Sequence, residues 1–314
     1  MILDMTTPQE YAAILQRLPE EIRAIVEDDL PLLDEIIIDR YSLLSVRLAD
    51  MRITYPLLID DRAFERIDAL MQQEVPGGWR KDGRIGIPGT LHRLSRETNV
   101  SNLTSMITVR VGRALMGVAE PLRDVLYDAV THEYGIAIIG PPAAGKTTLL
   151  RDIARILAER LGAGLVIIDT SNEIAGDSDH KHPIVGAARR VPVGNPLWQG
   201  EKFARAIGNM GPKALLSDEI GYRDDIPVIA MNAPRGVSVT ATLHGKNMRR
   251  VAHSQNLWPI LGIKDGVKTE PAVFKIAIEV PRRGFFRVHE DFDASLTCLL
   301  AGEEPTEGIR EIHA

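Results

Sequence analysis

Residues 134–161 read YGIAIIGPPAAGKTTLLRDIARILAERL, and the order of elements that this segment predicts sets the fold class. An apolar run of strand length comes first, a loop with glycine and proline follows, and from Lys146 onward the apolar residues have helical spacing. Strand, loop and helix in this order begin an α/β unit. Within the loop, Gly140, Gly145, Lys146 and Thr147 satisfy the pattern G-x-x-x-x-G-K-[ST].

This loop has the chemistry of a phosphate site. Its glycines let the backbone curl around an anion, and the exposed N–H groups at the start of a helix favour negative charge. Lys146 would reach the β and γ phosphates of ATP, and Thr147 would hold Mg²⁺. We therefore predict that nucleotide is bound by Gly140, Pro141, Pro142, Ala143, Ala144, Gly145, Lys146, Thr147 and Thr148.

The pattern continues as α/β on the carboxyl side of the loop. A helix is expected from about Lys146 to Leu161, followed by the buried strand candidates GLVIIDT from Gly164, ALLSDEIG from Ala214 and VSVTATLHG from Val237. FKIAIEV and FFRVHED flank PRRG and predict a β-hairpin, after which SLTCLLAG has helical character. The fold class is thus α/β, with a parallel-rich sheet covered by helices on both faces.

The first part of the chain has a different pattern, which predicts a smaller α+β domain. We expect a helical pair broken at Pro19, strands between residues 33 and 60, a helix over 61–73, a loop over 76–89 and a strand over 106–115. The expected domains are residues 1–118, residues 119–302 with the hairpin, and a polar tail over 303–314.

Composition narrows the class of protein. The chain has 314 residues, 45% of them hydrophobic and 25% charged, which is typical of globular domains. A net charge of -6 gives no global attraction to nucleic acid, which is therefore the runner-up partner. The first residues are unlike a secretory signal and no long apolar segment follows, so we expect a cytoplasmic protein, at most peripheral to a membrane complex. The single cysteine, Cys298, lies among apolar residues and is expected to be an inert thiol.

Asp218 and Glu219 predict the hydrolytic part of the site. They end an apolar strand, where Asp218 would hold the magnesium and Glu219 would act as the base that activates water. A solvated acidic pair at a strand end is the alternative. No N-K-x-D string for reading guanine is present, which favours ATP over GTP.

Other candidate site residues follow strand ends or stand in loops. His244 is a candidate sensor of the γ phosphate, with Thr242 a weaker companion, and Glu173 could orient water or magnesium. A structural role for the histidine and loop capping for Glu173 remain open, and Asp169 is the poorer candidate.

Two charged clusters have competing interpretations. Arg189 and Arg190 could stabilise the transferred phosphoryl group in trans across a subunit interface, or form a solvated turn or an intramolecular ion pair. A second cluster fits no strong zinc template, so exposed loop polarity is favoured over a metal site. Its members are Asp177, Asp179, His180 and His182.

Several longer strings resemble the stage III sporulation protein AA family, close to its cyanobacterial and chloroplast P-loop ATPase relatives. The strings are GIPGTLHRLS from Gly86, VRVGRA from Val109, GPPAAGKTTLLRDIARILA from Gly140, IIDTSNEIAGDSD from Ile167, HPIVGAARR from His182, DEIG from Asp218, ATLHG from Ala241 and FRVHED from Phe286.

The resemblance implies a RecA-like ATPase core preceded by a smaller domain, similar to secretion ATPases that work as homo-oligomeric, commonly hexameric rings on a membrane-associated transport or assembly apparatus. It implies that Lys146 and Thr147 belong to the P-loop, Asp218 and Glu219 to Walker B, Glu173 to an acidic box and His244 to a sensor position. It also makes Arg110 a candidate contact from the first domain.

Two further functions remain open from the sequence. A nucleic-acid translocase could line its pore with Lys246, Arg249 and Arg250, for which a solvated helix start is the alternative. A nucleotide-gated scaffold that assembles without turnover is the other, although intact Lys146 and Glu219 speak against it. The main prediction is an ATP-hydrolysing motor.

Overall fold

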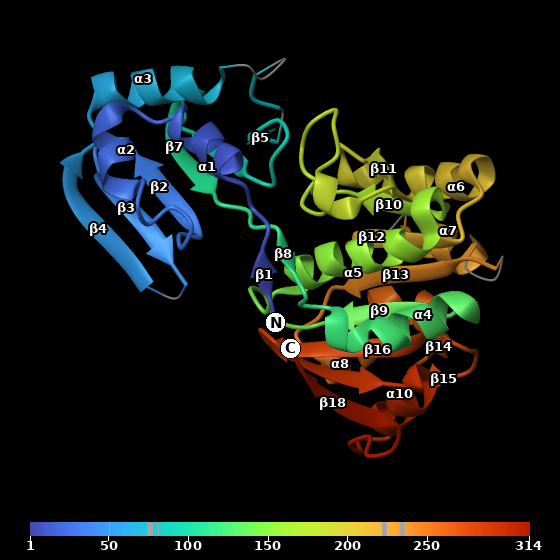
Figure 1. Cartoon of the computed structure of the whole chain (residues 1–314). Helices are drawn as coiled ribbons and strands as arrows, with labels where there is room; N and C mark the ends of the chain where they lie inside the picture. Colours follow the sequence, from blue (N-terminus) through green and yellow to red (C-terminus); the bar gives the residue numbers. More distant parts are fainter. Residues whose placement is uncertain (50, 74–77, 81, 222–224, 233–235) are drawn as a thin grey trace. The chain divides into compact units, whose positions relative to one another are not determined.

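A computed structural model describes residues 1–49, 51–73, 78–80, 82–221, 225–232 and 236–314 (Figure 1). The chain forms two compact units. The smaller unit contains residues 4–114 and 176–182, and the larger one contains residues 1–3, 115–175 and 183–314. Short strands β1 (Leu3–Asp4) and β8 (Leu115–Met116) lie where the chain passes from one unit to the other.

The smaller unit is an antiparallel sheet with one face covered by helices. Its described strands lie in the order β4-β3-β2-β7-β6-β5. Alternate residues of the strands, such as Ile36 and Ile38, pack against apolar residues of the helices, such as Ile22 and Phe64. The elements are α1 (Pro8–Leu15), α2 (Glu20–Val26), β2 (Glu35–Asp39), β3 (Leu43–Leu48), β4 (Met51–Leu58), α3 (Asp61–Met71), β5 (Arg84–Gly86), β6 (Arg93–Thr98) and β7 (Thr104–Arg110).

Most of the expected elements of this unit are present. The helix pair breaks at Pro19, which occupies the N-cap position of α2, and the strands expected between residues 33 and 60 form as β2, β3 and β4, followed by helix α3. Strand β6 was not predicted, and β5 lies inside the stretch 76–89 that we expected to be loop throughout. Residues 76, 77 and 81 of that stretch lie outside the described residues.

The larger unit is built on a mixed sheet whose described strands have the order β11-β10-β12-β13-β9-β16-β17-β18. Neighbours are parallel from β11 to β16, and the remaining two pairings are antiparallel. The strands are β9 (Gly135–Ile139), β10 (Leu165–Asp169), β11 (Arg189–Pro192), β12 (Ala214–Ile220), β13 (Ser238–Leu243), β16 (Phe274–Arg282), β17 (Phe285–His289) and β18 (Ile309–His313).

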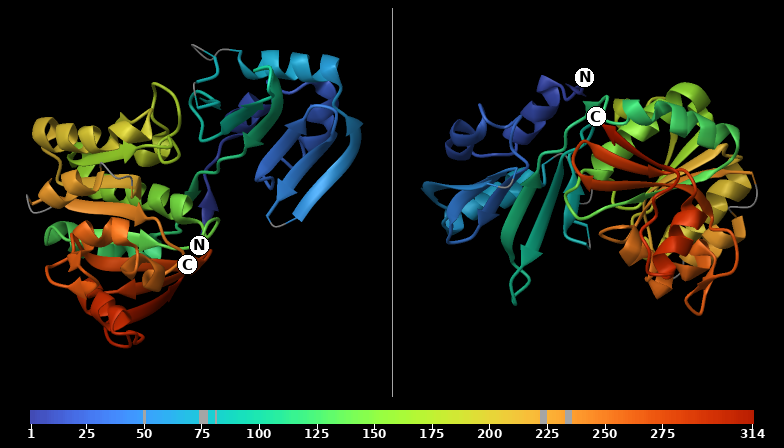
Figure 2. Two further views of the ribbon diagram at one scale, coloured as in Figure 1. Left: turned by 180° about the vertical axis from the view of Figure 1, so that it is seen from behind. Right: turned by 90° about the horizontal axis from the view of Figure 1, so that it is seen from below.

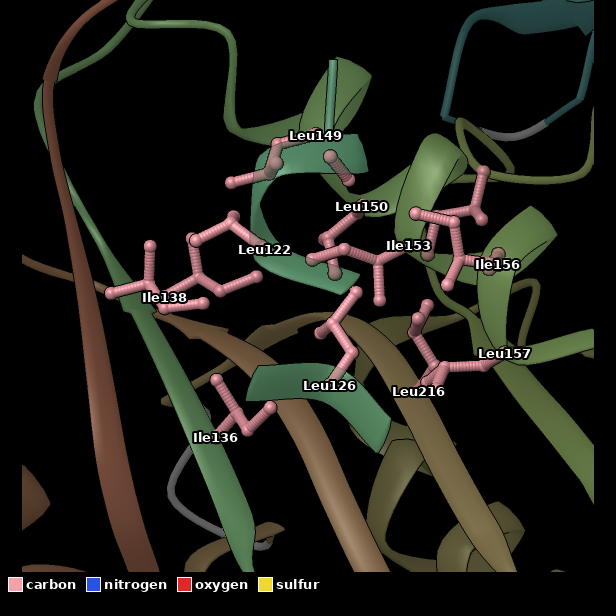
Figure 3. Packing of buried hydrophobic residues seen from close by; sticks show 14 of the residues in the cluster. Leu122, Leu126, Ile136, Ile138, Leu149, Leu150, Ile153, Ile156, Leu157 and Leu216 are labelled. Atoms are coloured by element: carbon pink, nitrogen blue, oxygen red, sulfur yellow. The ribbon is translucent and has the colours of Figure 1, made fainter. Parts of the chain in front are cut away.

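Helices cover both faces of this sheet, as the sequence predicts. On one face, side chains of α4 and α5 meet Ile136 and Ile138 of β9 and Leu216 of β12 (Figure 3). Each of these buried side chains contributes about 1.5–3 kcal/mol of hydrophobic free energy. The helices are α4 (Arg123–Thr131), α5 (Lys146–Leu161), α6 (Gln199–Met210), α7 (Asp225–Asn232), α8 (Met248–Ala252), α9 (Trp258–Leu261) and α10 (Phe292–Leu300).

The hairpin of β16 and β17 completes the larger unit. It forms where FKIAIEV and FFRVHED predict it, and β16 pairs with β9 beside the phosphate loop. A further small hairpin joins β14 (Ile263–Lys264) to β15 (Val267–Lys268). Residues 309–313, expected to be part of a polar tail, form β18 at the sheet edge instead, because Phe286 and Val288 of β17 offer a ladder for Ile312 and Arg310.

The two chain ends, both in the larger unit, lie side by side in every view (Figure 2). Among the described residues, none of the helices is long and apolar enough to span a bilayer.

Candidate nucleotide-binding and hydrolytic site

The larger unit has a pocket of about 330 Å³ at the carboxyl ends of four neighbouring parallel strands. Strands β9, β10, β12 and β13 each end at this edge, where ligands of open α/β sheets bind. The pocket is lined by Gly140, Pro142, Lys146, Thr147, Ser171, Glu173, Asp218, Glu219, Thr242, Leu243, His244, Gly245 and Lys246. The sheet order thus brings together residues up to about a hundred positions apart.

The loop between β9 and α5 has a shape that its sequence requires. Gly145 has a φ of 92°, a value that a residue with a side chain adopts only with strain. It directly precedes the first turn of α5. A Cβ on Gly140 would lie 2.4 Å from the carbonyl oxygen of Val280 on β16, so glycine is needed there as well. These two glycines allow the loop to wrap closely around a phosphate.

Lys146 closes the phosphate loop on itself. Its Nζ donates hydrogen bonds to the carbonyl oxygens of Gly140 at 2.7 Å and Pro141 at 2.8 Å. Partial burial lowers the pKa of Lys146, and the negative charge of Glu219 opposes that shift. A bound phosphate would offer the ammonium group a stronger partner than these carbonyl oxygens.

Asp218 lies at the end of β12, where both its carboxylate oxygens accept backbone hydrogen bonds. Thr170 N–H donates to one oxygen at 3.0 Å and Ser171 N–H to the other at 2.5 Å. Burial raises the pKa of Asp218 to about 7, and the charge of the neighbouring Asp169 adds to the rise. A nearby cation would stabilise the ionised form of this carboxylate.

The oxygen donors in the pocket fit a magnesium ion. Mg²⁺ in nucleotide sites takes one or two protein oxygens, and water and phosphate oxygens complete its shell. Thr147 and Asp218, the two residues predicted to hold magnesium, both line the pocket, and the magnesium itself stays a prediction. Thr147 Oγ1 donates to Glu173 Oε2 at 3.3 Å, which leaves the lone pairs of the hydroxyl oxygen for a cation.

Glu219 and His244 lie together at the open side of the pocket. Nδ1 of His244 is 3.1 Å from Oε1 of Glu219, and the histidine side chain is 86% exposed. Thr242 Oγ1 donates to the carbonyl oxygen of Asp218, so the end of β13 is tied to the end of β12. The predicted sensor therefore contacts the predicted base directly.

Asp169 shapes the turn that carries Glu173. It is fully buried, and its carboxylate accepts N–H bonds from Ile174 at 3.2 Å and Ala175 at 2.9 Å. Burial raises its pKa, which the two backbone donors and the nearby Arg190 oppose. Sequence reasoning ranked Asp169 low because nothing in a linear pattern shows that a strand-end carboxylate turns inward.

The structure does not bring Arg189 and Arg190 into the pocket. Arg189 donates to the carbonyl oxygens of Ala163 and Met210, each at 2.7 Å, which precede the amino ends of β10 and β12. The side chain of Arg190 is 7% exposed and donates to Asn172 Oδ1 at 3.0 Å. Their role in trans stays a prediction.

The loop with Asp177 and His182 belongs to the smaller unit. Arg80 Nη1 donates to Asp177 Oδ1 at 2.7 Å, and His182 Nε2 lies 3.0 Å from Glu10 Oε2. Both residues of the second pair are buried. No set of three or more potential metal ligands occurs among the residues that the structure describes.

The remaining positively charged candidate residues lie in the pocket, on α8 and in the smaller unit. Lys246 lines the pocket, whereas Arg249 Nη2 pairs with Glu304 Oε1 at 2.6 Å. Arg250 is exposed on α8. In the smaller unit, Arg110 Nε donates to Glu35 Oε1 at 3.0 Å.

Two residues near the site were missed by sequence reasoning. Arg283, at the tip of the β16–β17 hairpin, donates from Nε to the carbonyl oxygen of Ala143 at 3.3 Å. The predicted PRRG turn would have indicated Arg283 only if the sequence had also placed the hairpin beside the phosphate loop. Gln199 is the other, and no motif marks it.

The sheet order and the phosphate loop give the larger unit a RecA-like P-loop fold. In its fold the chain is similar to the ATPase DotB of Legionella pneumophila, with a TM-score of 0.54 and 16% identity over 92% of this chain and 85% of that one. It is likewise similar to the pilus retraction motor PilT, with a TM-score of 0.56 and 13% identity over 82% and 77%.

Sequence comparison gives the family. Residues 75–262, more than half of the chain, match the family described as sporulation stage III, protein AA, and the chain belongs to that family. It is similar to the protein ycf45 of Porphyra purpurea, with 35% identity over 75% of this chain and 44% of the relative, and to SEEDLING PLASTID DEVELOPMENT 1 of Arabidopsis thaliana, with 34% over 75% and 36%.

Stage III sporulation protein AA of Bacillus subtilis is 31% identical over 56% of this chain and 58% of its own length. The chain thus spans less than half the length of the Porphyra and Arabidopsis relatives. The family resemblance expected from the sequence strings is confirmed.

Proposed function

We propose that this chain binds ATP with magnesium and hydrolyses it. The observation that carries the proposal is that one pocket contains the phosphate-loop residues Lys146 and Thr147 together with three carboxylates, Glu173, Asp218 and Glu219. A site for phosphate alone would not need three acids, which repel an anion. Acids beside a phosphate loop suit a site that holds a cation and activates water.

The chain's own groups would divide the work as follows. N–H groups of residues 143–148, which include the start of α5, would bind the phosphates, and Lys146 would turn from the carbonyl oxygens of the loop to the β and γ phosphates. Thr147 and Asp218 would hold the magnesium ion, which supplies charge neutralisation of the phosphates when bound.

Glu219 is the group that we assign as general base. Its carboxylate lies at the open side of the pocket, 41% exposed, where water can reach it. His244, bonded to Glu219, would fix the orientation of that carboxylate and report on the γ phosphate. Glu173 is bonded to Thr147 and would order the magnesium shell.

We further propose that the hydrolysis drives conformational work in a homo-oligomeric, hexameric ring of the secretion type, peripheral to a membrane-associated apparatus. The support is the shared fold with DotB, an ATPase, and PilT, a pilus retraction motor crystallised with ADP. In such a ring Arg110 of the smaller unit and Arg189 would act on the nucleotide of a neighbouring subunit.

The test is steady-state ATP hydrolysis by the wild-type chain and by Glu219→Gln, with sizing and light scattering in the presence and absence of ATP. We expect turnover in the wild type, its loss in the variant, and ATP-dependent oligomers in both. Stimulation by single-stranded DNA would instead favour a nucleic-acid motor. ATP binding and assembly without turnover would favour a nucleotide-gated scaffold.

A further inference from the structure

Gln199 connects the two loops that carry the pocket's carboxylates. It is the first residue of α6 and is fully buried, directly after Leu197 and Trp198, whose side chains are exposed. Its side-chain Oε1 accepts a hydrogen bond of 2.6 Å from Thr170 Oγ1, and its Nε2 donates to the carbonyl oxygen of Glu219. One amide group therefore bridges the segment after β10 and the end of β12.

The two bridged segments are also joined by Asp218, which accepts the N–H bonds of Thr170 and Ser171. Thr170 begins the turn that leads to Glu173, and Glu219 is bonded to Gln199 through its own backbone. Gln199 and Asp218 therefore fasten the same two segments at different points. Gln199 therefore adds side-chain links to the Thr170 hydroxyl and the Glu219 carbonyl oxygen, beyond the two N–H bonds that Asp218 accepts.

The chemistry of the bridge requires an amide. A buried amide is costly unless its donor and acceptor are both satisfied, and here each has a partner on a different segment. An apolar side chain would leave the Thr170 hydroxyl and the Glu219 carbonyl oxygen without this partner. A carboxylate would keep the bond from Thr170 but could donate to Glu219 only when protonated.

We propose that Gln199 is a positioning residue for the hydrolytic step, which holds the Glu173 turn and Glu219 at a fixed separation. The proposal rests on the proposed ATPase function. Among the described residues, Gln199 does not line the pocket. Its loss should therefore lower kcat and leave nucleotide affinity nearly unchanged, because the phosphate loop is untouched.

The test compares Gln199→Leu with Glu201→Gln, a matched change at an exposed position of the same helix. Misplacement of catalytic groups by about 1 Å costs on the order of a hundredfold, so we expect Gln199→Leu to lose tenfold to a hundredfold in kcat, with KM within about threefold of wild type. A kcat within about twofold of wild type would overturn the proposal. So would a parallel loss of ATP affinity and melting temperature, which indicates a merely structural role.

Two more variants resolve the bridge. Thr170→Val removes one of the hydrogen bonds of the bridge. The double variant Thr170→Val, Gln199→Leu should lose less kcat than the product of the two single fold-losses, because both changes break the same bridge. Gln199→Glu should regain kcat relative to wild type as the pH falls, because protonation restores the donor to the Glu219 carbonyl oxygen. Additive effects or a flat relative pH profile would overturn the bridge.

If the wild-type chain binds ATP but shows no turnover, the proposed ATPase function fails, and the positioning role of Gln199 is still testable. Hydrogen exchange then tests the positioning directly. Amides of residues 170–175 should exchange faster in Gln199→Leu and at the wild-type rate in Glu201→Gln. Equal exchange in both variants would overturn the role of Gln199.

Discussion

The phosphate side and the acidic side of the pocket are built in different ways. The phosphate side is one continuous segment, residues 140–148, and Lys146 finds its hydrogen-bond partners five and six residues away. The acidic side is assembled from the ends of β10, β12 and β13 and the start of α6. The Thr170 N–H to Asp218 bond alone joins residues 48 positions apart.

Because of this difference, we expect substitutions on the two sides of the pocket to affect different steps, nucleotide binding or turnover. Substitutions on the phosphate side should mainly weaken the affinity for nucleotide, because the loop makes the contacts to the phosphates. Changes on the acidic side should reach turnover first, because they alter how distant carboxylates are placed while the loop stays intact. Substitutions on the two sides should therefore separate nucleotide binding from turnover.

Lys146→Ala should abolish both binding and turnover. Removing the cation that neutralises the phosphates in a partly buried site should lower the hydrolysis rate on the order of a thousandfold and raise the dissociation constant for ATP. Fluorescent-nucleotide titration and phosphate release measure the two effects. Lys264→Ala, at an exposed position on β14, is the control. Retained affinity in Lys146→Ala would contradict the role of the phosphate side.

Glu219→Gln should lose turnover on the order of a hundredfold and retain nucleotide affinity, since general-base catalysis disappears while the phosphate loop is unchanged. The measurement is single-turnover hydrolysis beside equilibrium binding. If the variant hydrolyses ATP at the wild-type rate, Glu173 becomes the candidate base.

Gly140→Ala should damage the phosphate side without removing any charge. Its Cβ would come within 2.4 Å of the Val280 carbonyl oxygen, so β9 and β16 must shift apart at a cost of about 1–3 kcal/mol. We expect a lower melting temperature and affinity for ATP weakened about tenfold or more. Gly208→Ala on α6, with open space around the new methyl group, should be harmless.

His244→Ala should have the smallest effect. The histidine is exposed and makes one described bond to Glu219, so its loss should lower kcat about threefold to tenfold and leave KM and stability unchanged. A change in KM greater than the change in kcat would place His244 on the binding side of the pocket instead.

Much of this molecule could be predicted from its residues, and the reason is locality. The phosphate loop, α5 and the apolar strands around them are each specified within a few residues, and the bounds of α5 match the expected ones. The structure brings Asp218, Glu219, Glu173 and His244 together in one pocket, because strand ends of one parallel sheet meet at one edge, and their catalytic roles stay predictions.

The parts that were missed depend on long-range pairing. Strand β11 was not predicted, and its place beside β10 brings Arg190 to Asn172 and within 3.7 Å of Asp169, which is the intramolecular ion pair kept as an alternative. Gln199 acquires its role through bonds to residues 29 and 20 positions away. No local pattern carries that information.

The chain's return to the smaller unit at residues 176–182 has a practical consequence for cutting and recombining this protein. A fragment that ends at residue 114 would lack His182 and Asp177, which partner Glu10 and Arg80, and would keep Glu10 without its buried histidine. The smaller unit therefore cannot be removed, or exchanged between relatives, by a single cut in the chain near residue 114. A chimera must carry both pieces, and the family match over residues 75–262 already includes the second.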